Sequence, residues 1–87
     1  MKAIWKFPLS VVDGIQSRNI PIGSSFCHAG NDPRGPGVAV WFAVDSAMGE
    51  ELKNFMVVGT GHPLPEHSQY LGSAAQNGFI WHILQLR

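Results

Sequence analysis

The stretch VAVWFAV at residues 38–44 decides the fold, because every side chain in it is apolar. In an extended strand, successive side chains point to opposite faces. This alternation places Val38, Val40, Phe42 and Val44 on one face, and Ala39, Trp41 and Ala43 on the other. A strand that is apolar on both faces lies in the middle of a sheet, or a second subunit covers its outer face. We therefore predict a central strand here.

The segments around this strand carry the same alternation. Ala3, Trp5, Phe7 and Leu9 share one face of a first strand. Pro8 makes that strand an edge, because proline cannot donate a ladder hydrogen bond. Residues 11–20 are expected to return along this first strand as a hairpin. Further strands are expected at residues 24–28, 53–58, 69–73 and 79–86.

Glycine and proline separate these strands. Turns or loops are expected at residues 21–23, 29–37, 59–65 and 76–78, the last with an Asn-Gly pair typical of tight hairpins. Asp45 and Ser46 are suited to cap one short helical turn through Leu52. About six short strands, with turn signals between them, predict an all-β fold, either a small antiparallel sandwich or a barrel. We expect a single β domain over residues 1–87.

The composition excludes several classes of protein. Six Lys and Arg balance six Asp and Glu, so no net charge favours non-specific nucleic-acid binding or a membrane surface. Cys27 is the only cysteine, which excludes an internal disulfide and fits a reducing cytoplasm. No signal peptide or apolar run of the ~18 residues that a membrane helix needs is visible. With 45% hydrophobic and 14% charged residues, so short a chain is expected to form a homo-oligomer.

Several blocks of sequence carry a family resemblance. They are IWKFPL at residues 4–9, IPIG at 20–23, WFAVD at 41–45, FMVVGTGHPLP at 55–65, YLGS at 70–73 and FIWHI at 79–83. In this order they resemble a family of uncharacterised small bacteriophage proteins. The resemblance implies a compact β fold of phage origin, located in the host cytoplasm. The NDPRGPG loop at residues 31–37 departs from the family, which has a shorter polar turn there.

The loop GTGHPLP at residues 59–65 is the strongest candidate for a binding site. Its glycines let a ligand approach the backbone, and successive free N–H groups can form an anion-binding nest. His62 can donate to a phosphate or a base, or it can instead hold the loop by bonding a backbone carbonyl. Trp41 and Tyr70 offer rings for stacking, and Arg34 offers a cation. The expected ligand-binding residues are Gly59, Thr60, Gly61, His62, Trp41, Tyr70 and Arg34.

The remaining reactive residues favour no catalytic or metal chemistry. The four histidines match no metal-ligand spacing, so we expect no metal and no cofactor. His82 shares a strand face with Ile80 and Leu84 and is assigned to a core or interface. Cys27 is expected to be a small buried residue, and His28 should point to the opposite face of its strand. No nucleophile and base pair follows from the sequence, so an enzyme is not expected.

Two binding functions remain. In the first, a phage accessory protein, acting in counter-defence, sequesters a small nucleotide-like ligand at an oligomer interface. In the alternative, the chain is a protein-interaction module that inhibits a host defence complex, or a minor phage structural or assembly protein. A concave pocket at the GTGHP loop favours the first hypothesis, whereas a flat apolar patch or a free strand edge favours the second.

Overall fold

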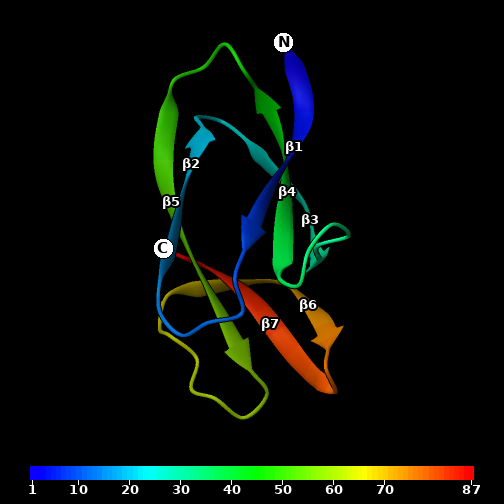
Figure 1. The fold of residues 1–87 in the computed structure, drawn as a ribbon. Coiled ribbons are helices and arrows are strands. Elements are labelled where there is room, and N and C mark those ends of the chain that lie inside the picture. The colour runs from blue at the N-terminus through cyan, green and yellow to red at the C-terminus, as the bar shows by residue number, and fades with distance from the viewer.

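The computed structural model describes residues 1–87 and contains seven strands and no helix (Figure 1). The strands are β1 (Lys2–Leu9), β2 (Gln16–Pro21), β3 (Ser25–Asn31), β4 (Val38–Asp45), β5 (Glu50–Gly59), β6 (Ser68–Gln76) and β7 (Phe79–Leu86). Without a helix, the structure has no helical segment that could cross a bilayer.

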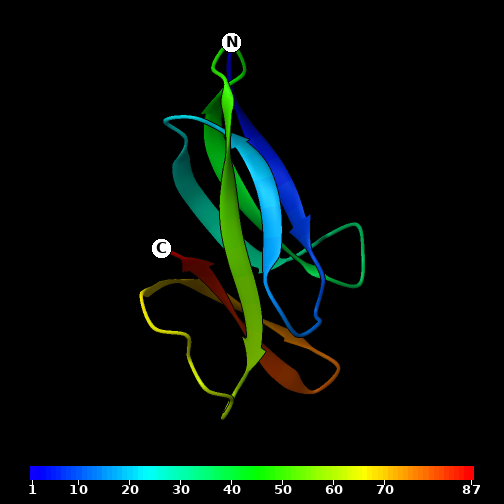
Figure 2. The same cartoon turned by 90° about the vertical axis from the view of Figure 1, so that its left-hand side faces the viewer.

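The strands form two antiparallel sheets. Sheet A has the order β1-β4-β3, and sheet B has the order β2-β5-β7-β6. Seen from the side of β5, β2 and β5 pass in front of sheet A, while β6 and β7 lie at the lower end of the molecule (Figure 2). The predicted all-β fold is confirmed, and of the two expected forms, sandwich or barrel, the two sheets form a sandwich; it has seven strands where about six were expected.

The central position of β4 follows from its two apolar faces and is confirmed, because β1 and β3 pair with it on either side. Val38, Val40, Phe42 and Val44 point into the core. Pro8 lies in β1, which is the edge strand that proline requires.

The core fills the space between the two sheets. Phe55 of β5 is fully buried, and its ring contacts Phe42 of β4 edge to face at 6.3 Å between centroids. Such aromatic pairs add ~0.5–1.5 kcal/mol to the area they bury. The core residues are Leu9, Ile20, Ala29, Val38, Val40, Phe42, Val44, Phe55, Val57, Ala74 and Ile83.

The predicted hairpin of residues 11–20 against the first strand is wrong, because β1 and β2 belong to different sheets. The chain crosses between the sheets after Leu9, so that Leu9 and Ile20 both reach the core. The Gln16 side chain holds this crossing by donating to Ser10 O and accepting from Ser10 N–H, at 2.7 and 2.8 Å. Alternation alone does not say whether the next strand pairs with its neighbour or faces it across the core.

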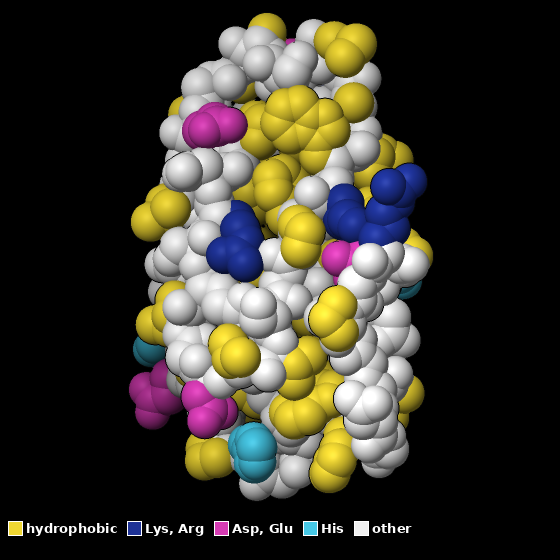
Figure 3. All heavy atoms as spheres, viewed as in Figure 1, with side chains coloured by type: hydrophobic (Ala, Val, Ile, Leu, Met, Phe, Trp, Pro, Cys, Tyr) yellow, Lys and Arg dark blue, Asp and Glu magenta, His cyan; other side chains and the backbone are white.

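One side of the sandwich is closed and the other is more open. At the closed side, β3 approaches β6 so closely that a Cβ on Gly72 would lie 2.9 Å from the carbonyl oxygen of Ala29. At the other side, no backbone ladder joins β1 and β2, which belong to different sheets. Trp5 points to the core side of sheet A yet remains 36% exposed, and hydrophobic side chains show through the surface in this view (Figure 3).

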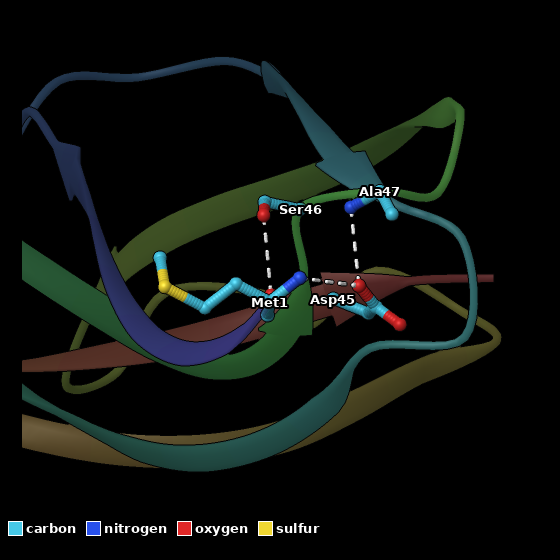
Figure 4. A network of polar contacts seen from close by, with 4 residues as sticks. All are labelled: Met1, Asp45, Ser46 and Ala47. Carbon is cyan, nitrogen blue, oxygen red and sulfur yellow. Dashed lines mark hydrogen bonds and ion pairs between the residues drawn. The ribbon is translucent and has the colours of Figure 1, made fainter.

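The predicted helical turn after Asp45 is also wrong, because residues 46–48 form a tight turn into β5. Asp45 Oδ1 accepts from Ala47 N–H at 3.1 Å and from the amino group of Met1 at 3.3 Å (Figure 4). Ser46 donates to Met1 O through both its N–H and its hydroxyl. The Ala47 N–H and the ammonium group hold the pKa of Asp45 below its ordinary 3.8. Aspartate here forms a local turn in competition with the helix.

The glycine-rich loop that follows β3 is attached to the sheets on both sides. Asp32 bonds the Lys6 ammonium at 2.7 Å and also accepts from Arg34 N–H. These contacts, led by that of Lys6, hold the pKa of Asp32 below its ordinary 3.8. Gln76 of β6 donates to Gly37 O and to Asn31 Oδ1. Composition predicts an exposed loop over residues 29–37, but residues 29–31 belong to β3 and these polar side chains anchor the rest.

Cys27 is exposed, which corrects its assignment as a buried residue. The register of β3 against β4 shifts between Phe26 and His28, so Cys27 is the extra residue of a β-bulge. A bulge breaks the strict alternation on which the assignment rested.

Candidate functional site

The GTGHP loop borders a pocket of ≈ 310 Å³ on the face of sheet B that points away from sheet A. Strand register explains this placement: Val58 of β5 pairs with His82 of β7, whereas Val57 and Ile83 point into the core. The pocket is lined by Val58, Gly59, Thr60, Gly61, His62, Leu64, Tyr70 and His82.

His62 holds the end of β5. The pairing of β2 with β5 stops at Gln16 and Phe55, and β5 continues to Gly59. Beyond that point, His62 takes the place of a partner strand for Gly59. The His62 N–H donates to Gly59 O at 3.1 Å, and His62 Nδ1 accepts from Gly59 N–H at 3.3 Å. The loop turns at Gly61, whose φ of 91° favours glycine. His62 is therefore a tie within the loop, and in its neutral form the proton resides on Nε2.

A chain of three side chains forms the opposite wall of the pocket. Both ring nitrogens of His82 have hydroxyl partners: Tyr70 O–H lies 2.8 Å from Nδ1, and Thr60 Oγ1 lies 2.8 Å from Nε2. Thr60 also donates to Ile80 O at 3.4 Å. The Tyr70 ring packs at a tilt against His82, with centroids 5.7 Å apart, and is itself 56% exposed. The three residues come from the loop, β6 and β7.

The structure unites five of the seven predicted ligand-binding residues. Gly59, Thr60, Gly61, His62 and Tyr70 line the one pocket.

The other two predicted residues lie elsewhere. Trp41 is on the outer face of sheet A, where its ring packs against His28 at 5.2 Å between centroids. Arg34 lies in the loop anchored by Asp32, and its N–H donates to that carboxylate. Neither residue lines the pocket at the GTGHP loop.

Sequence reasoning missed His82 as a member of the site. Its alternation with Ile80 and Leu84 correctly gave its strand face, but on that face His82 lies under the loop and lines the pocket, outside the core cluster. His82 is 22 residues from Thr60. The FIWHI pattern gives no signal that the two meet, because only the pairing of β5 with β7 brings them together.

The charges near the pocket are few. None of the Lys, Arg, Asp or Glu side chains lines it. No three His, Cys, Asp or Glu residues gather anywhere in the structure as a possible metal centre. The pocket thus offers hydroxyls, imidazoles, backbone N–H groups and apolar carbon, without a fixed charge.

Comparison with known proteins gives one match. Residues 1–87 match a family model described as Domain of unknown function (DUF7352). The chain belongs to this family. No curated protein and no solved structure shows significant similarity to it. For this member of DUF7352, the geometry of the site therefore carries the functional argument.

Proposed function

We propose that this protein binds and sequesters a small nucleotide-like ligand in the pocket formed by the GTGHP loop, Tyr70 and His82. The observation that supports the proposal is the chain Tyr70–His82–Thr60, two hydrogen bonds of 2.8 Å beside a cavity of ≈ 310 Å³. Ligand pockets commonly measure ~300–1,000 Å³ and combine apolar walls with a few placed polar groups. Val58 and Leu64 supply apolar surface here, and the Tyr70 ring offers a stacking face.

The proposal includes the setting and the assembly. A non-enzymatic accessory protein of bacteriophage origin, acting in counter-defence in the host cytoplasm, agrees with the sequence resemblance. The pocket rim is apolar: Leu64 is 65% exposed, and the Tyr70 ring is also exposed. A second copy of the chain that covers this rim would enclose the ligand, which is the oligomer-interface form of the proposal.

Thermal shift measurements with a panel of nucleosides and nucleotides test the proposal. A ligand at 100 times its Kd stabilises the folded state by about 2.7 kcal/mol, which is a large shift for a small domain. Tyr70→Phe removes one exposed hydroxyl, so it should leave the Tm of the free protein nearly unchanged while it reduces the ligand-induced shift.

His28→Ala is the matched control, because His28 is also an exposed aromatic ring but lies on sheet A. It should keep the full shift. If no compound in the panel shifts the Tm, or if Tyr70→Phe and His28→Ala respond alike, the pocket is not a ligand site. His62→Ala is less decisive alone, since it also removes the tie to Gly59.

The protein-interaction module remains a second candidate, and one observation favours it. Trp5 and Phe26 flank buried Phe42 on the inner face of sheet A, and they stay 36% and 38% exposed. Exposed aromatic side chains are typical of interface anchors. Trp5→Ala should abolish capture of a host defence or phage assembly protein without an effect on ligand binding, and a pull-down with both variants separates the two functions.

A further inference from the structure

We infer that the pocket recognises an uncharged planar ring through a lactam edge, that is, a carbonyl beside an N–H, as found in nucleobases such as uracil. This inference rests on the proposed function and names the chemical class of its ligand. It follows from the charges, the hydrogen-bond donors and the proton order of the site.

The pocket carries no charged side chain. Phosphate groups in proteins are bound by Arg or Lys side chains, by helix N-termini or by nests of successive free N–H groups. This pocket has no cation and no helix, and the His62 N–H that a nest on the loop would use is bonded to Gly59 O. Three of the six cations are held by other partners: Lys6 bonds Asp32, Arg18 donates to Pro8 O and Ser17 O, and Lys53 pairs with Glu51. A phosphate would gain no compensating charge in the pocket. No carboxylate is present to attract a cationic ligand either.

The loop offers hydrogen-bond donors to a ligand in the pocket. Gly61 N–H has no partner in the chain. His62 accepts from Gly59 through Nδ1, which leaves Nε2–H as a donor. Both residues line the pocket. The loop side therefore suits a ligand acceptor such as a carbonyl oxygen.

The hydrogen-bonded side chains Tyr70, His82 and Thr60 can carry their protons in two orders. In one order, Tyr70 O–H donates to Nδ1 of His82, Nε2–H donates to Thr60 Oγ1, and the Thr60 proton is free to bond Ile80 O. In the reverse order, Thr60 must donate to Nε2 and loses its bond to Ile80. The first order keeps one more hydrogen bond, and it leaves the Tyr70 oxygen as an acceptor.

Together these groups define the complement of the ligand. The N–H groups of the loop can donate to a ligand carbonyl, and the Tyr70 oxygen can accept from a ligand N–H. A ligand edge with one carbonyl and one N–H matches both. The exposed Tyr70 ring and the Leu64 side chain offer apolar contacts for a flat ring. A volume of ≈ 310 Å³ is at the small end for ligand pockets and suits a single base better than a whole dinucleotide.

Two isomeric probes test the edge by calorimetry. 1-Methylthymine keeps the N–H between its two carbonyls, and 1,3-dimethyluracil carries a methyl group on that nitrogen instead. We expect 1-methylthymine to bind and 1,3-dimethyluracil to bind at least tenfold more weakly. Tyr70→Phe should weaken 1-methylthymine about threefold to tenfold, the effect of one neutral hydrogen bond.

Thr60→Val should reduce the preference between the isomers, because nothing then fixes the proton order, whereas Thr60→Ser keeps the hydroxyl and should retain the preference. Equal binding of the isomers, or no binding of 1-methylthymine, overturns the lactam inference. Uridine and uridine monophosphate should bind alike, and tenfold tighter binding of the phosphate also overturns it. If the isomers bind equally, or if uridine monophosphate binds more tightly than uridine, the pocket still binds a ligand and the proposed function survives. The proposed function itself fails if no compound in the wider panel of nucleosides and nucleotides shifts the Tm.

Discussion

The closed side of the sandwich should be highly sensitive to one added methyl group at Gly72. At Gly72 a Cβ would lie 2.9 Å from Ala29 O and 3.2 Å from Ala29 Cβ, both closer than ordinary van der Waals contact. The obstacle is backbone and Ala29 has no rotamer to change, so β6 or β3 must move. Overpacking of this kind costs about 1–3 kcal/mol. In a domain of this size, Gly72→Ala should therefore lower the Tm by about 5–20 °C.

Gly49→Ala is the matched control for this experiment. The nearest atom to its added Cβ would be Ile22 Cδ1 at 3.9 Å, an ordinary contact, and its φ is not in the left-handed region. Removing the glycine reduces the entropy of the unfolded chain, so Gly49→Ala should be neutral or slightly stabilising. Calorimetric melting of the two variants decides the matter. If Gly72→Ala melts within a degree or two of Gly49→Ala, the β3 and β6 backbones are not in tight contact.

Three further outcomes are expected. Because Lys6 lowers the pKa of Asp32 in the folded state, the stability that this pair gives is present above the ordinary pKa of 3.8 and is lost as the pH falls through the folded-state pKa. In Asp32→Asn, the free energy of unfolding measured in urea should therefore change less with pH across that acid range. Exposed Cys27 should react stoichiometrically with a thiol reagent in native buffer, and slow reaction that matches global unfolding would contradict the structure. Light scattering at micromolar concentration should give a mass above 9.5 kDa, the mass of one chain, and a monomer would remove the oligomer proposal.

The strand pattern was predictable because alternation and turn chemistry are local. VAVWFAV gave the central strand, and the Asn-Gly pair gave the β6–β7 turn, where Asn77 and Gly78 both have positive φ. The pairing of strands into sheets does not follow from such local patterns. The alternation of residues in β1 and β2 is the same whether they pair or face each other, so the sequence could not show that they belong to different sheets.

The site was predictable in part for the same reason. The glycines of the GTGHP loop mark a place where the backbone turns, and His62 is close to them in sequence. His82 joins the site only through the register of β5 against β7, which no local pattern specifies. Arg34 is predicted on its charge alone, but Asp32 and Gln76 hold its loop and it does not line the pocket.

The assignment of β1 and β2 to different sheets also affects how fast the chain can fold. Only β3 with β4 and β6 with β7 are hairpins between consecutive strands, whereas β1 must find β4 and β2 must find β5 across intervening chain. Pairings of such sequence separation require loop closure before any contact is gained, and folds dominated by them take milliseconds to seconds. The two local hairpins are thus the natural early structures. Before β2 pairs with β5, the apolar side chain of Ile20 is exposed. In that period the unfolded chain can associate with other copies of itself.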